Sequence, residues 1–408
     1  MIESLRARPW QTAAVVIMAG CVISLISFGP RSALGLFLTP MTEARGWSRE
    51  IFALAIAIQN IVWGAGQPLA GAVADRYGTA RVLAAGGVLY AAGLVVTAWA
   101  PTPMMLHLGA GVMIGLGMAA ASFSIVLAAF GRAVTPQRRS IAFGIGTAAG
   151  SFGQFLFAPL GQGLIQTVGW QQALIVMAAM MLAVPFLAYA LQGKPAVPAP
   201  GLGLDQSIPE ALSEAFGHKS FVLLVAGFFV CGFHVAFITT HLPPYITDVG
   251  LDPILGAWAI GMIGLFNIVG SLASGVIGGR YSKPVFLSLI YFARAVAIAL
   301  FVILPATPLS VLVFAATIGL LWLSTVPPTS GLVAVMFGPR YMATLFGFVF
   351  FSHQAGAFLG VWLGGRLYDQ YQSYDVVWWL AVALGVFAAI VHWPIREQPV
   401  ERLAREAA

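Results

Sequence analysis

Charged residues and cysteine are scarce in this sequence. Lys, Arg, Asp and Glu together make up 8% of its 408 residues, whereas a soluble globular protein carries about 25%. This scarcity excludes an ordinary soluble protein, and a chain so apolar is not intrinsically disordered either. Two cysteines exclude a disulfide scaffold, and 46 glycines without a Gly-X-Y period exclude collagen. These absences leave an integral membrane protein.

Long apolar stretches stand where the charges are missing. Hydrophobic residues make up 60% of the chain, and a helix needs about 20 apolar residues to cross a bilayer. The sequence therefore predicts an all-α integral membrane protein with twelve transmembrane helices. The stretches lie at residues 11–38, 51–74, 80–99, 104–130, 139–166, 170–192, 219–245, 254–279, 284–304, 308–335, 341–367 and 375–394.

The basic residues predict the orientation of these spans. Of 20 Lys and Arg residues, three (Arg45, Arg49 and Arg366) fall in odd-numbered loops. Most of the others lie at the termini or in even-numbered loops, and positive residues collect on the cytoplasmic side. We therefore expect a multi-pass protein of the cell inner (cytoplasmic) membrane with both termini in the cytoplasm. The net charge of +6 then reflects topology, and no basic run indicates a nucleic-acid partner.

A repeat divides the chain into two halves. Residues 193–218 form a long connector that begins rich in proline and glycine. A shift of 203 residues also places Gly153 on Gly356 and Pro40 on Pro243. Parallel repeats of six helices are typical of transporters that hold substrate near the bilayer midplane. We expect two six-helix bundles related by a pseudo-two-fold axis, at 1–192 and 219–408, joined by a cytoplasmic linker at 193–218.

A motif in the loop between the second and third spans points to a family. Gly71, Asp75, Arg76, Gly78 and Arg81 resemble the G-x-x-x-D-R-x-G-x-[RK] signature of the major facilitator superfamily. The resemblance implies that Asp75 lies near the cytoplasmic end of a helix of the opposite half. It also implies that Arg76 and Arg81 complete a charge cluster that holds the outward-open state.

The first span narrows the resemblance. Residues 28–37, followed by Gly46-Trp47-Ser48-Arg49, resemble the monocarboxylate porters and their bacterial oxalate/formate-type relatives. The resemblance implies that Arg31 faces the substrate. The eighth span departs from the animal members, because it has Asn267 but neither their aspartate nor their arginine. A coupling mechanism that needs that pair cannot be transferred to this chain.

Two arginines, Arg31 and Arg294, and no carboxylate lie in the interior of the predicted spans, away from the span ends. Each buried charge is costly, by about 2.5–3.5 kcal/mol on insertion scales, so it tends to persist where it has a role or a partner. A planar guanidinium suits a carboxylate, which favours an organic anion as the missing partner of Arg31. For Arg294, in the ninth span, two roles stay open: bonding the carbonyls of a neighbouring helix, or binding substrate.

Histidines are the other titratable groups in the spans. His234 occupies the position of Arg31 under the 203-residue shift, and His353 lies in the eleventh span. Both are candidates for substrate binding and for carrying a coupled proton, because histidine changes charge near neutral pH. The alternative for each is a neutral, packed side chain. Asn267, Ser324 and Gln154 complete the candidate substrate-binding residues.

The sequence has no pattern that predicts an enzyme. We find no nucleophile beside a base, no His-Glu-x-x-His helix for a metal and no phosphate-binding glycine loop, so we expect no cofactor and no metal. The predicted function is a secondary active transporter of a small organic anion, with a monocarboxylate foremost. An exchanger of the oxalate/formate type and an exporter of amphiphilic drugs or metabolites stay open. The expected partners are the anion, a proton or counter-anion, and the lipid bilayer, and the expected functional unit is a monomer.

Overall fold

The fold is helical and built to span a membrane. The computed structural model describes residues 12–135, 138–193, 206–338 and 341–406. Within these ranges, twelve helical spans are long and apolar enough to cross a bilayer. They coincide with the twelve predicted stretches to within a few residues, except that the first span extends to Arg45. The predicted fold class is therefore confirmed.

The first six spans pack around one hydrophobic core. Several of them change helix type along their length, as in the fourth span, which contains a π-helical segment. The elements are α1 (Ala13–Ala33), η1 (Leu34–Phe37), α2 (Leu38–Arg45), α3 (Arg49–Tyr77), α4 (Thr79–Trp99), α5 (Pro103–Leu106), η2 (His107–Met113), α6 (Ile114–Ala120), α7 (Phe123–Ala133), α8 (Arg139–Val168), α9 (Trp170–Met181), α10 (Ala183–Ala188) and η4 (Tyr189–Leu191).

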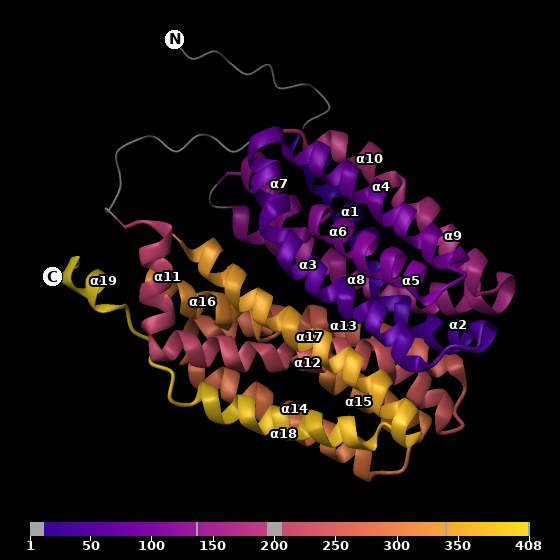
Figure 1. Ribbon diagram of the computed structural model, residues 1–408. Helices are drawn as coiled ribbons and strands as arrows, with labels where there is room; N and C mark the ends of the chain where they lie inside the picture. The colour runs from indigo at the N-terminus through magenta and orange to yellow at the C-terminus, as the bar shows by residue number, and fades with distance from the viewer. Residues whose placement is uncertain (1–11, 136–137, 194–205, 339–340, 407–408) are drawn as a thin grey trace.

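The last six spans pack around a second core. Figure 1 shows the two groups as separate bundles, one in indigo to magenta and the other in pink to yellow. The elements are α12 (Lys219–Asp248), α13 (Pro253–Arg280), α14 (Lys283–Ile303), α15 (Pro308–Leu321), α16 (Val326–Phe337), α17 (Met342–Tyr371) and α18 (Asp375–His392). We call the two groups the N-terminal and the C-terminal bundle.

Two short helices lie outside the bundles. Of the predicted linker, residues 194–205 are outside the described part of the chain, and the rest contains α11 (Ile208–Gly217). Ser207 and Glu210 form a capping box at its start. An ion pair between Glu214 of α11 and Arg402 ties it to α19 (Glu401–Glu406) near the C-terminus. We call this end of the molecule the terminal end and the opposite end the distal end (Figure 1).

Two spans are interrupted. The first continues through Pro30 and changes only at η1, which begins four residues after that proline. The tenth is interrupted between Leu321, where α15 ends, and Val326, where α16 begins. Its paired prolines follow in the first turn of α16, where a missing N–H costs no helical hydrogen bond.

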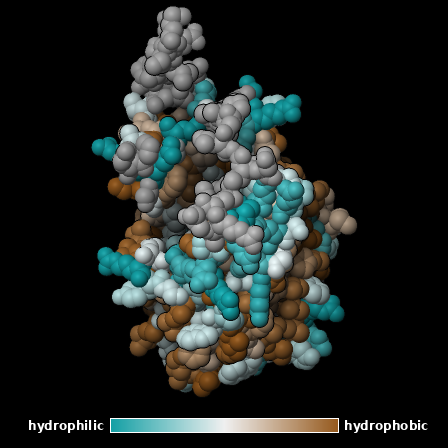
Figure 2. All heavy atoms as spheres, turned by 90° about the vertical axis from the view of Figure 1, so that its left-hand side faces the viewer, coloured by the Kyte–Doolittle hydropathy of each residue, from teal (hydrophilic) through white to brown (hydrophobic). Residues whose placement is uncertain are grey.

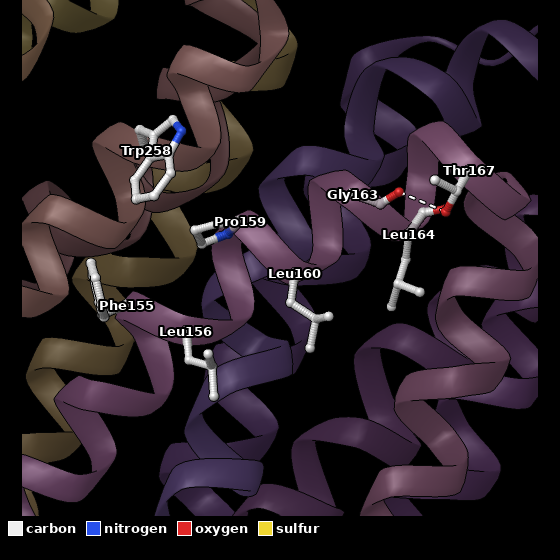
Figure 3. A pocket seen from close by; sticks show the side chains of 8 residues that line it. All are labelled: Phe155, Leu156, Pro159, Leu160, Gly163, Leu164, Thr167 and Trp258. Carbon is white, nitrogen blue, oxygen red and sulfur yellow. Dashed lines mark hydrogen bonds between the residues drawn. The ribbon is translucent and has the colours of Figure 1, made fainter.

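The bundles touch along the middle and the distal halves of four helices. The α8–α13 seam (Figure 3) and the α3–α17 seam bring glycines against the other bundle. A methyl group on Gly261 would lie 3.2 Å from the carbonyl oxygen of Phe155, and one on Gly64 would lie 2.8 Å from Gln354. Because glycine lets backbones approach closely, the distal end is closed.

The same four helices separate toward the terminal end. A methyl group on Gly71 of α3, Gly144 of α8, Gly275 of α13 or Gly347 of α17 would meet no atom within 4 Å. Seen from this end, the surface is largely hydrophilic and a recess lies between the bundles (Figure 2). The molecule is therefore open at the terminal end and closed at the distal end.

Candidate functional site

Arg31 lies where the first span meets the middle of α3. Its Nη2 donates a hydrogen bond of 2.8 Å to Oδ1 of Asn60. Its guanidinium carbon lies 4.9 Å from the ring centroid of Trp63, a cation–π distance. Trp63 is the fifteenth of 29 residues in α3. The arginine is thus held at about half the depth of the span.

The C-terminal bundle completes this region through α17. The ring of Phe350 meets Trp63 edge to face, with centroids 5.4 Å apart. Gln354, one turn further along α17, lies against Gly64 of α3 and is fully buried. We define the central polar cluster as Arg31, Gln59, Asn60, Trp63 and Gln354. Its members come from both bundles.

Donors without acceptors dominate the central polar cluster. Three buried N–H groups have no hydrogen-bond partner in the described structure: Nε of Arg31, Nε1 of Trp63 and Nε2 of Gln354. One acceptor, Oε1 of Gln59, is also without a partner. Every acidic residue of the described spans lies within a turn of a span end. An anion that entered the cluster would therefore accept hydrogen bonds from these donors.

A narrow cavity joins the cluster to α12. Arg31, Gln59 and Asn60 line it on one side, and Thr239 and Thr240 line it on the other. Its volume is about 10 Å³, which is room for about one water molecule. The polar side chains that α12 brings to this cavity are therefore these threonines.

His234 does not point into this cavity. Its Nε2 lies 2.8 Å from the carbonyl oxygen of Ala381 on α18, and the side chain is 1% exposed. A methyl group on Gly385 of α18 would lie 3.3 Å from the ring. His234 thus packs toward α18, within the C-terminal bundle, although it shares the repeat position of Arg31.

His353 borders the central polar cluster. Its ring stacks on Phe350, with an interplanar angle of 8°, and lies 5.2 Å from the ring centroid of Phe228. Its Nδ1 lies 3.2 Å from Oε1 of Gln354. With Nδ1 protonated, His353 donates to that oxygen and leaves the Gln354 amide nitrogen free to donate.

Asn267 and Gln154 lie on the α8–α13 seam. Nδ2 of Asn267 donates to Oγ of Ser151 at 2.9 Å, across the seam. Its Oδ1 accepts from the backbone N–H of Leu323 at 3.0 Å, in the break of the tenth span. Gln154 donates to the carbonyl of Ile260 at 3.1 Å. Both side chains join the two bundles.

Ser324 and Arg294 both act at the break of the tenth span. The hydroxyl of Ser324 donates to the carbonyl of Leu320 at 2.5 Å. The Arg294 guanidinium donates to the carbonyls of Leu321 and Trp322, which lie where α15 ends. These contacts match a structural role for Arg294 and not a substrate-binding one, because the guanidinium bonds carbonyls that have lost their helical donors.

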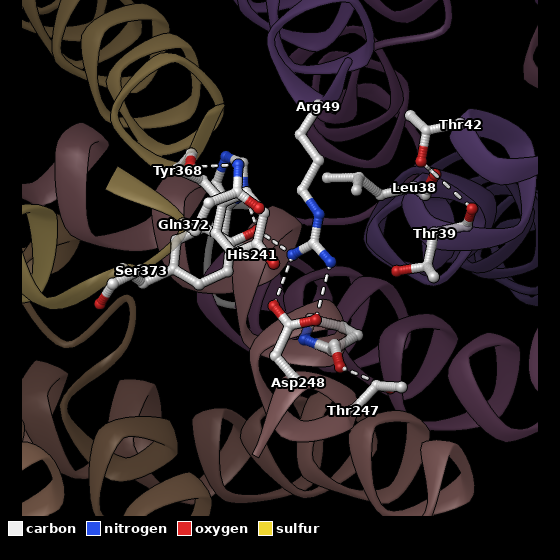
Figure 4. Close-up of polar contacts among 12 residues, drawn as sticks. Leu38, Thr39, Thr42, Arg49, His241, Thr247, Asp248, Tyr368, Gln372 and Ser373 are labelled. Atoms are coloured by element: carbon white, nitrogen blue, oxygen red, sulfur yellow. Dashed lines mark hydrogen bonds and ion pairs between the residues drawn. The ribbon is translucent and has the colours of Figure 1, made fainter. Parts of the chain in front are cut away.

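An ion pair joins the bundles at the distal end. Both terminal nitrogens of Arg49, at the start of α3, bond the carboxylate of Asp248, at the end of α12, at 2.6 and 2.7 Å (Figure 4). The guanidinium also donates to the Tyr374 hydroxyl at 2.9 Å and lies 3.8 Å from the ring centroid of Tyr368. Burial raises the pKa of Tyr374, so its hydroxyl stays neutral at physiological pH.

Asp369 of α17 caps the start of α3 across the same interface. Its carboxylate accepts from the backbone N–H groups of Arg49 and Glu50 at 3.1 and 2.8 Å. The side chain of Ser48, at the N-cap position, makes no capping bond, so the cap comes from the other bundle. Glu50 in turn accepts from Trp362 at 3.0 Å. We call Arg49, Asp248, Asp369 and their contacts the distal gate.

Comparison with known proteins identifies the family. The sequence profile of the Major Facilitator Superfamily matches residues 20–361. The chain belongs to the Major Facilitator Superfamily. As a member, it is a multi-pass membrane transporter and not an enzyme.

The curated relatives of this superfamily member are distant. It is 24% identical to the uncharacterized MFS-type transporter YcxA of Bacillus subtilis, over 88% of this chain and 90% of that protein. It is 25% identical to monocarboxylate transporter 13 of Rattus norvegicus, over 93% and 89% of the two chains. A bacterial Spinster homologue solved in an inward-facing, unoccupied conformation has the same fold, with a TM-score of 0.75 at 15% identity, over 95% of this chain and 97% of that one.

The superfamily motif lies at the open, terminal end. Asp75, Arg76 and Arg81 are exposed there. Gly78 ends α3 with a φ of +96°, a conformation that favours glycine. Gly71 has no neighbour in reach of an added methyl group. The motif therefore lies free of the other bundle in this state of the transporter.

The distal gate and most of the central polar cluster were not predicted from the sequence. Arg49 was assigned only to an external loop. The sequence does contain a sign of the ion pair, because Arg49 and Asp248 stand at span ends on the same side of the membrane in the predicted topology. Their pairing across 199 residues needs the folded structure.

Proposed function

We propose that the protein is a secondary active transporter that moves a small organic anion, a monocarboxylate, across the cytoplasmic membrane by alternating access. The observation that carries this proposal is the set of buried donors without acceptors around Arg31. A carboxylate offers about four acceptor positions to such donors. The named monocarboxylate transporters among the relatives support the same substrate class.

The geometry around Arg31 favours a small anion. Asn60 accepts from Nη2 of Arg31, so it orients the guanidinium, while the neighbouring Nε has no hydrogen-bond partner. Trp63 packs on the guanidinium and limits the space beside it. A guanidinium held in this way can bind a carboxylate with two hydrogen bonds, which a lysine cannot reproduce.

The open and closed ends of the molecule can be assigned to the two sides of the membrane. With basic residues concentrated at the terminal end, we place that end in the cytoplasm, so this state is inward-facing. The distal gate then closes the route to the outside. Because both bundles come from one chain, we propose that the monomer is the transporting unit.

His353 is the coupling candidate with the best position. It is the titratable neighbour of Gln354 in the central polar cluster, whereas His234 is bonded to α18. We propose that protonation of His353 accompanies anion binding and keeps the loaded site closer to neutral. The alternative is anion exchange without a proton, and the vesicle uptake experiment described below distinguishes the two mechanisms.

Ligand-induced thermal stabilisation of the purified protein tests the substrate class. A panel of small carboxylates should raise the melting temperature, because a ligand of the folded state stabilises it, while lipophilic cations should not. Arg31→Gln should lose the shift and Arg31→Lys should weaken it. Arg280→Gln, an exposed arginine of α13, is the matched control and should behave as the wild type.

An unchanged carboxylate shift in Arg31→Gln would refute the proposed anion site. Stabilisation by lipophilic cations instead of carboxylates would favour an exporter of amphiphiles. For coupling, uptake into vesicles should rise when an inward-directed proton gradient is imposed. His353→Gln should keep anion exchange and lose this pH response. Exchange without any pH response in the wild type would identify an exchanger.

A further inference from the structure

A groove runs along the outside of the α8–α13 seam. One stripe of α8, from Phe155 to Thr167, forms its floor, and Trp258 of α13 forms a wall beside Pro159 (Figure 3). Its volume is about 580 Å³, which falls in the range of small-molecule sites. Neither the central polar cluster nor the distal gate contributes to it.

The groove is apolar and faces the bilayer. Leu156, Leu160 and Trp258 are 43%, 37% and 45% exposed. Two side chains of the lining carry polar groups, Thr167 and Trp258. The hydroxyl of Thr167 donates to the carbonyl of Gly163 at 2.8 Å within α8, and Trp258 has its indole N–H. The lining thus offers mainly hydrocarbon surface and no charged group, which fits a hydrocarbon occupant.

The length of the groove matches one leaflet. From Phe155 to Thr167 the helix rises about 18 Å, at 1.5 Å per residue. The hydrocarbon core of a bilayer is about 30 Å thick, so one leaflet supplies about 15 Å. The groove begins beside Val168, where α8 ends at the distal end. An acyl chain that enters from the distal interface would therefore lie along its whole length.

We propose that the groove binds one acyl chain of a phospholipid from the distal leaflet. The floor belongs to the N-terminal bundle and the Trp258 wall to the C-terminal bundle. The site is therefore complete only while α8 and α13 stay packed in their distal halves, with Gly261 against Phe155. Binding is selective for this state of the transporter and does not depend on the identity of the substrate.

Tryptophan quenching by brominated phospholipid tests the site. The full-length protein is placed in vesicles of phosphatidylcholine with bromine at the middle of one chain. The quenching due to Trp258 is the difference between wild type and Trp258→Phe. Trp379 of α18 is the reference, because it is 47% exposed and lies at a similar distance from the distal end of its helix. Trp258 should be quenched at least twofold more than Trp379.

A groove-filling variant gives the second arm. A methyl group on Gly163 would meet no atom within 4 Å, so Gly163→Leu can fill the groove without a clash. It should lower Trp258 quenching to the Trp379 level. Gly144→Leu, on the same helix and equally unobstructed but outside the groove, should leave it unchanged.

Three results would overturn the proposal. They are equal quenching of Trp258 and Trp379 in the wild type, undiminished quenching in Gly163→Leu, and quenching by brominated free fatty acid but not by brominated phospholipid. If Gly163→Leu fails to fold, native mass spectrometry of the wild type decides. One phospholipid retained per protein supports the site, and none retained refutes it.

Discussion

Removing the charge of Asp248 should loosen the distal gate. Asp248→Asn deletes a bidentate ion pair between bundles whose side chains are 13% and 27% exposed. Hydrogen bonds to charged groups contribute about 1.5–3 kcal/mol and exposed ion pairs about 0.2–1 kcal/mol. A partly buried pair falls between these values, at about 1–2 kcal/mol. The ratio of distal-open to distal-closed molecules should therefore rise about 5- to 30-fold.

Labelling of a single cysteine measures this ratio. Thr239→Cys, in a background without Cys21 and Cys231, lies in the cavity beside Arg31. A membrane-impermeant thiol reagent added from the distal side should react about 5- to 30-fold faster when Asp248→Asn is present. Asp252→Asn is the control, because Asp252 lies at the same end but caps its own helix. Equal rates in a folded Asp248→Asn protein would refute the gate.

Three further substitutions test other parts of the argument. Arg294→Gln should lower the melting temperature by several degrees, because buried carbonyls lose charged donors, and should leave anion affinity unchanged. Thermal unfolding with and without ligand measures both effects. Lost affinity at unchanged stability would contradict the structural role. Asp75→Asn should weaken the distal-open state and slow distal labelling, and an unchanged labelling ratio would speak against a gating role for the motif. Gly365→Val should speed distal labelling, since its side chain would meet α3 at 2.5 Å, whereas Gly347→Val meets nothing and should have no effect.

The fold was predictable because it rests on composition and period. Each span is recognisable in the sequence as about 20 apolar residues. In lipid, the backbone N–H and C=O groups of such a segment must bond one another, and a helix satisfies this requirement. Local chain breaks were less predictable. A proline inside a span favours a break beside it, but α1 continues through Pro30 and the helix type changes only at η1.

The site was predictable only in part. Arg31 stood out because an uncompensated charge in a membrane span is rare. Its partners Asn60 and Trp63 carry no such signal, since polar and aromatic residues in a span have many packing roles. The 203-residue shift places His234 on Arg31, but such a sequence match does not fix side-chain direction. His234 turns to a carbonyl of α18, and this choice depends on the space left by Gly385.

Opening of the distal gate should change the hydration of α3, because Asp369 of the other bundle caps the start of this helix. When the distal end opens, Asp369 moves away from the first N–H groups of α3, and the Ser48 side chain does not cap them. Water must then solvate these donors, because uncapped helix ends need another acceptor. Opening thus takes up water as a reactant. An osmolyte that is excluded from protein surfaces, such as sucrose, should favour the closed gate, so the working cycle of this transporter should respond to osmotic stress.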